Sequence, residues 1–386
     1  MNNFSYHVPT DIRFGKDQIA CLPEELKKYG HRVLLVYGGG SIKRTGLYDK
    51  VCQLLHEFEI YELPGIEPNP KLKSVRTGAK LCKEHKIDVI LAVGGGSCID
   101  AAKHIACGAY YDGDPWDLML DRSKITSALP IAVVLTICAT GSEMNSGAVI
   151  SNEETNEKLE INSPVLYPTL SICDPTYLYT LPKKQTAAGT VDIMSHVFEQ
   201  YFQPNMEAYV TDCLSEGVLK TCIKYGPIAL EEPDNYEARS NLMWASTIAL
   251  NHLLTVGKGG AWSVHPMEHE LSAFYDITHG VGLAILTPAW MKYVLCDKTV
   301  DRFVLFARNV WGIEAEDAYE AARLGIEKTE EFFKNLGMPQ RLSEVGIGTE
   351  KLQFMAEETV RTSRISSHSY YPLQAEDILK IFESVC

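Results

Sequence analysis

The sequence predicts two domains of different class, an α/β domain built on a parallel sheet and an all-helical domain that follows it. Two observations predict this. Up to about residue 182, short apolar runs rich in β-branched residues alternate with helical segments. From Lys183 onward apolar residues recur at helical spacing and strand-like runs nearly vanish. We therefore expect a boundary near Pro182, with domains at residues 1–182 and 183–386.

Four apolar runs in the first half predict buried strands. They are "RVLLVY" (32–37), "IYEL" (60–63), "DVILAV" (88–93) and "PIAVVL" (130–135). Helices are expected between them, around 45–57, near 70–86 and after the glycines at 94–96. Apolar strands that end in glycine and alternate with helices are typical of a parallel sheet covered on both faces.

Composition excludes several classes of function. A net charge of −14 argues against a nucleic-acid partner, because no basic stripe is present. The N-terminal stretch does not have the pattern of a secretory signal, and the longest apolar runs are too short to span a bilayer. The 11 cysteines form no C-x-x-C pair, which is typical of reduced intracellular thiols. A cytoplasmic protein is expected.

The turn "GGGSCID" (94–100) is a candidate phosphate-binding turn. Glycines at the carboxyl end of a parallel strand let a pyrophosphate approach the backbone, and a helix N-terminus points N–H groups at it. The residues concerned are Gly95, Gly96 and Ser97, and Asp100 lies one turn into the helix, where it could accept hydrogen bonds from a ribose or an amide. The same letters also suit a tight connection that binds nothing, since the G-x-G-x-x-G pattern is incomplete.

The turn "YGGGSIKRTG" (37–46) bears on the choice of nucleotide. An acid after such a strand holds the ribose of NAD, whereas this chain has Gly39, Gly40 and Ser41, followed by Lys43. Glycines admit a 2′-phosphate, so we expect a preference for NADP(H), with NAD(H) tolerated. After the fourth strand, "TICATGSE" supplies hydroxyls suited to a phosphate or a nicotinamide, at Thr136, Thr140 and Ser142.

Asp192 and His196 share one face of an otherwise apolar helix, because they are four residues apart. They are either an exposed pair or half of a metal site. The other half could come from "SVHPMEHELSAFYDITHG", in which His265, His269 and His279 lie within fifteen positions. One carboxylate and two of these three imidazoles, added to His196, would suit Fe²⁺ or Zn²⁺ and leave a position for a substrate oxygen.

A rival motif occupies the same letters. "HPMEH" fits H-x-x-E-H, the inverted zinc-protease pattern, with Glu268 as general base. That interpretation needs a further acidic ligand, and it explains neither "GGGSCID" nor the pair on the earlier helix. A metal site together with a nucleotide-binding turn favours a reaction other than proteolysis.

Four segments together resemble the iron-containing (group III) alcohol dehydrogenase family, and other stretches look like its butanol dehydrogenase branch. The segments are "GGGSCID", "ATGSEMN", "TAAGTVDIMSHVFE" and "HPMEHELSAFYDITHGVGLAILTP". The resemblance covers nearly the whole chain and implies a dehydroquinate-synthase-like architecture, with a dinucleotide-binding α/β domain and a metal-binding helical domain. The implied metal ligands are Asp192, His196, His265 and His279. The implied cofactor residues are Gly95, Gly96, Ser97, Asp100, Thr136, Thr140, Ser142, Lys158 and Leu178.

The resemblance also implies the reaction. It is hydride transfer at nicotinamide C4 between NAD(P)(H) and a small primary alcohol or aldehyde, such as butanol or butanal. The substrate oxygen is polarised by Fe²⁺, Zn²⁺ or another divalent metal. His269 is then either a proton relay or a residue that only shapes the pocket. A homodimer is expected, with "FSYHVP" and "DIRFG" as N-terminal edge strands. A lyase of dehydroquinate-synthase type and a non-catalytic nucleotide sensor remain as alternatives on the same fold.

Overall fold

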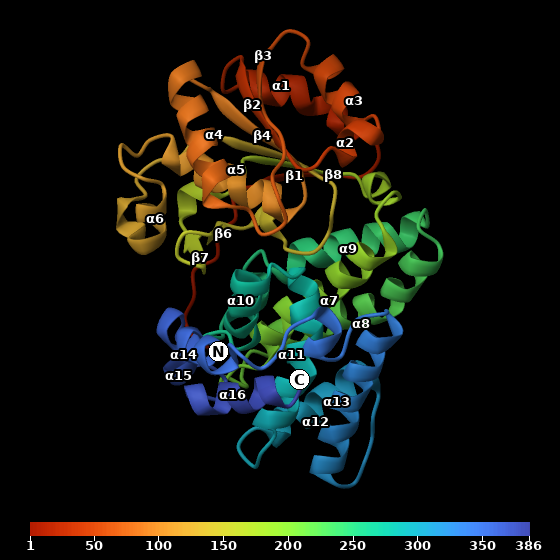
Figure 1. Cartoon of the computed structure of the whole chain (residues 1–386). Coiled ribbons are helices and arrows are strands. Elements are labelled where there is room, and N and C mark those ends of the chain that lie inside the picture. The colour runs from red at the N-terminus through yellow and green to blue at the C-terminus, as the bar shows by residue number, and fades with distance from the viewer. The chain divides into compact units, whose positions relative to one another are not determined.

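The computed structural model describes residues 1–386 and separates into two compact units, drawn in Figure 1. The α/β unit consists of His7–Leu181 and Pro233–Thr247. The helical unit consists of Met1–Tyr6, Pro182–Glu232 and Ile248–Cys386. Each unit is therefore discontinuous in sequence.

Two segments depart from the expected division at residue 182. The N-terminal segment joins the helical unit, where the backbone N–H of Asn2 donates to the carbonyl of Gly257 at 2.9 Å. The segment 233–247 joins the α/β unit, where Thr247 donates a 2.6 Å hydrogen bond to the buried carboxylate of Glu143. Burying a carboxylate without a hydrogen-bond partner costs free energy. The bond from Thr247 to Glu143 therefore stabilises the packing of this helical segment on the α/β unit, although it follows residue 182 in the sequence.

A six-stranded parallel sheet forms the core of the α/β unit, in the order β1-β8-β5-β4-β2-β3. The strands are β1 (Asp11–Phe14), β2 (Arg32–Tyr37), β3 (Glu59–Leu63), β4 (Val89–Gly94), β5 (Ile131–Leu135) and β8 (Leu170–Cys173). The four strands expected from apolar runs are β2 to β5, and the parallel sheet is confirmed. Their carboxyl ends share one edge, so the turns after β2, β4 and β5 lie along it.

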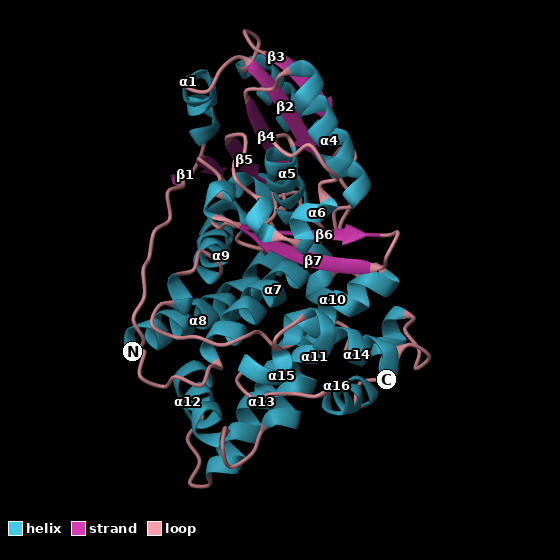
Figure 2. Ribbon diagram, turned by 90° about the vertical axis from the view of Figure 1, so that its left-hand side faces the viewer, coloured by secondary structure: helices cyan, strands magenta, loops and turns pink.

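Helices cover both faces of this sheet, as Figures 1 and 2 show. Val33 and Leu35 of β2 point to one face and pack with α1 (Leu22–Lys27) and α3 (Leu47–Leu54). On the other face lie α4 (Leu72–His85) and α5 (Gly96–Gly108), which are in close contact with one another. The shorter helices of this unit are α2 (Ser41–Arg44) and α6 (Trp116–Leu120), and α9 (Tyr236–Ala249) belongs to it up to Thr247.

An antiparallel hairpin, β6 (Gly147–Asn152) and β7 (Glu157–Asn162), lies outside the main sheet. The sequence did not lead us to expect it. Two backbone contacts attach it: the N–H of Val149 donates to the carboxylate of Asp100 at 3.0 Å, and the N–H of Ser151 donates to the carbonyl of Pro70 at 2.9 Å. The hairpin is thereby fixed to α5 and to the loop before α4.

The helical unit is built around α7 (Lys183–Tyr201), in which every residue from Thr186 to Tyr201 is buried. The helices packed around it include α8 (Tyr209–Glu231), α10 (Val264–Tyr275) and α11 (His279–Val294). The remaining helices are α12 (Val300–Trp311), α13 (Ala318–Asn335), α14 (Leu352–Thr362), α15 (Ile365–His368) and α16 (Ala375–Glu383). The all-helical class of this region is confirmed, and no helix in the chain has the length and apolar character needed to cross a membrane.

The expected N-terminal edge strands are half correct. "DIRF" forms β1 at the edge of the sheet, but "FSYHVP" forms no strand. Pro9 closes that segment, and its first residues, Met1 to Tyr6, pack with the helical unit rather than beside the sheet.

The close approach of α11 to α7 generates the first prediction. A Cβ at Gly280 would lie 2.2 Å from the carbonyl oxygen of Ala188, so Gly280→Ala should lower the free energy of unfolding by about 1–3 kcal/mol. Gly217, in the exposed middle of α8, has open space around it, and Gly217→Ala should stabilise by about 0.5–1 kcal/mol. Urea denaturation of the metal-free protein measures both. Equal stability of the two variants would contradict the predicted contact.

Candidate active site

Three helices bring together the side chains that the sequence predicts as metal ligands. Asp192 and His196 lie one turn apart on α7, His265 is in the first turn of α10, and His279 is the first residue of α11. From Asp192 Oδ1 it is 3.7 Å to His196 Nδ1 and 3.7 Å to His279 Nε2. The ligand atoms of Asp192, His265 and His279 all lie within 4.8 Å of one another. The ring of His196 is 4.7 Å from that of His265, centre to centre.

The donor set fits a divalent ion. His196 Nδ1 and His265 Nε2 are buried and have no hydrogen-bond partner within the protein. Two ligands of a tetrahedral ion, each about 2.1 Å from it, are roughly 3.4 Å apart, which is close to the separations around Asp192. Burial, together with the neighbouring imidazoles of His265 and His279, lowers the pKa of His196 well below its ordinary value. A neutral imidazole is the form that binds a metal.

His269 takes a different position from the other two histidines of its motif. It lies one turn after His265 on α10, and its ring centre is 5.8 Å from that of His279. Together with Glu268 and His279 it forms a second group of potential ligand atoms, in which Asp192 does not take part. His269 is also less buried than His265. The geometry therefore separates it from the cluster around Asp192.

Two buried carboxylates that the sequence did not single out as parts of the metal site contact these histidines. Glu199 Oε1 is 3.1 Å from His265 Nδ1, and Glu268 Oε2 contacts His279 Nδ1. The available signal for Glu199 was its spacing, seven residues after Asp192 and three after His196 on one helix. Because Glu268 is committed to a histidine side chain, the protease interpretation of "HPMEH" has no support.

The turn after β4 requires glycine at two successive positions. A Cβ at Gly95 would lie 2.9 Å from the side chain of Ile137, and one at Gly96 would lie 2.5 Å from the side chain of Thr140. Helix α5 starts at Gly96, so Gly96 and Ser97 supply its first N–H groups. The side chains of Ile137 and Thr140 fill the space that a Cβ would need at these two positions, and phosphate binding at this helix N-terminus stays a prediction.

The turn after β2 has more room around its glycines. A Cβ at Gly39 would have no other atom within 4 Å, and Gly40 adopts a left-handed backbone with φ of 91°. Ser41 then begins α2, and the ammonium of Lys43 lies over the rings of Tyr37 and Tyr48, 5.2 and 4.4 Å from their centres.

One acid near this turn was not expected, because it comes from the adjacent strand. Glu62 of β3 accepts hydrogen bonds from the hydroxyls of Tyr37 (2.5 Å) and Tyr48 (2.7 Å), and it lies 4.0 Å from the ammonium of Lys43. The bond from Tyr37 is the main reason why its pKa is lowered. Glu62 thus already interacts with three groups, two tyrosine hydroxyls and one ammonium.

Asp100 and Ser142, predicted for the nicotinamide side, bind one another. Ser142 Oγ donates to Asp100 Oδ1 at 2.6 Å, while Asp100 Oδ2 accepts from the N–H of Val149 at 3.0 Å. The fully buried ammonium of Lys103 donates to Ser142, Asn145 and the carbonyl of Gly147 at 2.7–2.9 Å. Burial lowers the pKa of Lys103 to about 8, against the attraction of Asp100. Lys103 was missed because a helical lysine is ordinarily exposed.

The remaining predicted residues of the nucleotide site also lie in the α/β unit. Lys158, on β7, donates to Asn69 at 3.0 Å, and Asn69 follows β3, so the hairpin brings Lys158 to the carboxyl edge of the sheet. Thr136 follows β5, and its N–H donates to the carbonyl of Gly94. Leu178 is fully buried in a short 3₁₀ turn.

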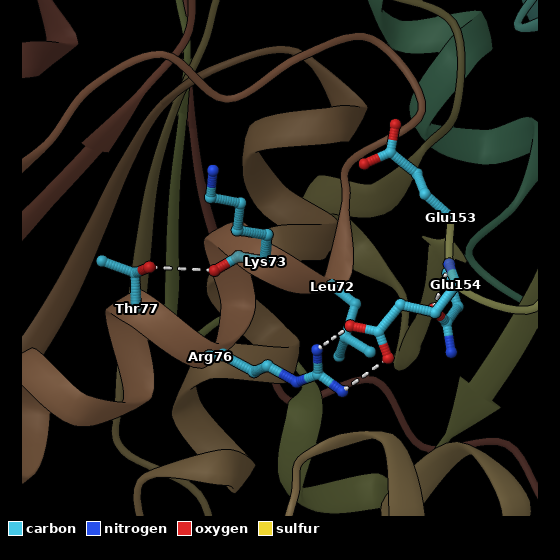
Figure 3. Close-up of a pocket in the computed structure, with 7 residues that line it drawn as sticks. Leu72, Lys73, Arg76, Thr77, Glu153 and Glu154 are labelled. Atoms are coloured by element: carbon cyan, nitrogen blue, oxygen red, sulfur yellow. Dashed lines mark hydrogen bonds and ion pairs between the residues drawn. The ribbon is translucent and has the colours of Figure 1, made fainter.

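A cavity of about 270 Å³ lies elsewhere on the α/β unit (Figure 3). It is lined by Leu72, Lys73, Arg76, Thr77, Asn152, Glu153 and Glu154, none of which the sequence predicted as a site residue. The guanidinium of Arg76 is bound by Glu154 at 2.6 Å and by Asp114 at 2.7 Å. The pairing with Glu154 fastens the β6–β7 turn to α4, and the pairing with Asp114 fastens the segment before α6 to the same helix.

Comparison with known proteins identifies the family. The model of the iron-containing alcohol dehydrogenases matches residues 9–175, and that of the Fe-containing alcohol dehydrogenase family, C-terminal, matches residues 186–386. The chain belongs to the iron-containing alcohol dehydrogenase family. It is an NAD(P)H-dependent oxidoreductase of the alcohol dehydrogenase and aldehyde reductase type, and the resemblance seen in the sequence is confirmed.

Individual relatives within the family agree with its butanol dehydrogenase branch. NADH-dependent butanol dehydrogenase A of Clostridium acetobutylicum is 57% identical over 386 residues, covering 99% of both chains. The NADPH-dependent aldehyde reductase YqhD of Escherichia coli is 43% identical over 350 residues, 90% of each. The crystal structure of NADH-dependent butanol dehydrogenase A from Thermotoga maritima superposes with a TM-score of 0.96 at 43% identity, covering 100% of this chain and 99% of that one.

Proposed function

We propose that this enzyme interconverts butanal and butanol, and similar small primary aldehydes and alcohols, with a divalent metal, Fe²⁺ in the first place, and a nicotinamide nucleotide. The observation that carries the proposal is the convergence of Asp192, His196, His265 and His279, in which His196 Nδ1 and His265 Nε2 are buried without a hydrogen-bond partner in the protein. The names of the relatives, butanol dehydrogenases and an aldehyde reductase, support the substrate class.

The chemistry of the bound groups is general: the metal supplies Lewis acidity to the substrate oxygen, and nicotinamide C4 exchanges the hydride. The protein's own residues hold and orient these groups. Gly95, Gly96 and Ser97 receive the pyrophosphate at the start of α5. Lys158 contributes a cation near the ribose, and Leu178 an apolar wall. His269 moves the proton, since it lies beside His279 without belonging to the Asp192 cluster.

Single histidine variants test these assignments. His265→Ala or His279→Ala should lose bound metal and butanal reduction together, because each removes a direct ligand. His269→Ala should keep the metal and lower kcat by about 10²–10⁴-fold if it relays the proton. Metal content by mass spectrometry and steady-state rates are measured on the same samples. A His269→Ala variant that lacks metal, beside a His265→Ala variant that retains it, would overturn the ligand assignment.

We propose further that the enzyme prefers NADP(H) and tolerates NAD(H). The names of relatives divide on this point, with NADH-dependent enzymes at 57% identity and an NADPH-dependent one at 43%. The turn after β2 supports a preference for NADP(H), because it is open at Gly39 and has Ser41 and Lys43 nearby as donors. Glu62, an acid near this turn, already binds two tyrosine hydroxyls and lies 4.0 Å from the ammonium of Lys43.

Gly39→Asp tests the cofactor preference. Gly39 has room for a side chain and, unlike Gly40, lies outside the left-handed region, so the variant should fold. The new carboxylate repels a 2′-phosphate and accepts from free ribose hydroxyls, and the ratio of kcat/KM for NADPH over NADH should fall at least tenfold. Gly39→Asn adds the same volume without the charge and should change the ratio less. Wild-type preference for NADH, or equal effects of Asp and Asn, would show that the adenosine end is recognised elsewhere.

We also propose a homodimer. Strand β1 is at the edge of the sheet and leaves one side without a partner strand in the chain, and Phe4, in the preceding segment, is 55% exposed. Light scattering at micromolar concentration should give twice the mass of the chain. Phe4→Asp should shift the population toward monomer, while Tyr110→Asp, at a similarly exposed ring just after α5, should not. A monomeric wild type contradicts the proposal.

A cytoplasmic location completes the proposal. All eleven cysteines are free, seven of them buried or half-buried within the α/β unit. Free thiols in such number suit a reducing compartment.

A further inference from the structure

Each of two metal-site histidines has a buried carboxylate against the nitrogen that faces away from the cluster. Glu199 Oε1 lies 3.1 Å from His265 Nδ1, and Glu268 Oε2 contacts His279 Nδ1. The side chain of Glu199 is 4% exposed, and that of Glu268 is not exposed at all. Carboxylates at such depth require partners, and in both cases a histidine ring is one of them.

The other bonds of Glu199 show that it acts as an acceptor. The N–H groups of Ser263, Val264 and His265 donate to its two oxygens at 2.7–2.8 Å. These are the first N–H groups of α10, which carry partial positive charge and have no partner within the helix. Since Glu199 accepts all three bonds, the bond with His265 is made by a proton on Nδ1. The free Nε2 of His265 is buried and has no partner in the protein.

Glu268 is held in a comparable way on the other side. Its Oε1 accepts from the hydroxyl of Ser272, one turn further along α10. Gly282 of α11 leaves the room that this side chain needs, because a Cβ there would lie 2.7 Å from Glu268 Cγ. With Glu268 fixed, His279 Nδ1 donates to it, and His279 Nε2 lies 3.7 Å from Asp192 Oδ1.

We propose that Glu199 and Glu268 are positioning residues which hold His265 and His279 in the Nδ1–H tautomer, so that both present an unprotonated Nε2 to the metal. The proposal rests on the metal site of the proposed function and adds which residues orient it. Carboxylates in this position raise the basicity of the ligand and fix the plane of the ring, and their loss ordinarily weakens metal binding by about 10–100-fold.

A competing role for Glu268 is that of a direct ligand, because its carboxylate also groups with His269 and His279 within 4.8 Å. The positioning role is favoured because Glu268 binds Ser272 and His279 Nδ1 and does not take part in the group formed by Asp192, His265 and His279. The two roles predict different consequences for Glu268→Gln, whose amide oxygen still accepts from Nδ1–H while its charge is gone.

The test measures metal affinity of the full chain rather than catalysis. Zn²⁺ dissociation constants come from competition with a chromogenic chelator, for wild type, Glu268→Gln, Glu268→Leu and Glu199→Gln. We expect a rise in Kd of about 10-fold for the Gln variants and about 100-fold for Glu268→Leu. Glu270→Gln is the matched control: Glu270 is buried on the same helix but binds Thr362, and its Kd should stay unchanged.

The outcomes separate the proposal from the metal site on which it rests. The variant Asp192→Asn tests the metal site. If it binds Zn²⁺ like wild type, the assignment of the metal site is wrong. If Asp192→Asn loses the metal while both Glu268 variants bind like wild type, the positioning role is overturned. Loss of metal in Glu268→Gln as complete as in Asp192→Asn makes Glu268 a ligand and also overturns it. Should Glu268→Leu fail to fold, judged by circular dichroism, the Gln variants decide alone.

Discussion

Polar side chains buried on one helix constrain the whole helical unit. Helix α7 is buried from Thr186 to Tyr201, yet it carries Asp192, His196 and Glu199. Taking such groups out of water is costly unless each finds a partner. Glu199 finds the first N–H groups of α10, and Asp192 lies beside the histidine that opens α11. The contacts that hold α7, α10 and α11 together therefore also position the candidate metal ligands.

The sequence predicts features whose cause is local. Strands β2 to β5 were expected because short apolar runs alternate with helical segments, and those of β2 and β4 stop at glycines. The spacing of Asp192 and His196 identified a shared helical face. Residues whose role depends on a distant partner were missed. Lys103 is buried only because Asp100 and the hairpin surround it, and Glu62 meets the turn after β2 only through strand pairing. No periodicity within one segment reports such neighbours.

The conformations of the hairpin β6–β7 and of the N-terminal segment also depend on tertiary contacts that local sequence does not predict. Neither has the strong apolar alternation of a half-buried strand, so tertiary contacts decide their conformation. Val149 is held by Asp100, and Asn2 is held by Gly257. Steric constraints were not predicted either. Glycine is necessary at position 280 because a Cβ there would lie 2.2 Å from the carbonyl oxygen of Ala188 on α7, a contact that depends on how the two helices pack.

The hydrogen bond between Thr247 and Glu143 joins residues 104 positions apart in the chain. During synthesis, the α/β unit has all its strands once Cys173 has left the ribosome, but this buried carboxylate lacks the Thr247 hydroxyl until α7, α8 and most of α9 have been made. Contacts of such separation form late, because a long loop must close first. Completion of the α/β unit is thus coupled to the synthesis of α7, α8 and α9, and an N-terminal fragment that stops at Leu181 lacks the hydroxyl that binds Glu143.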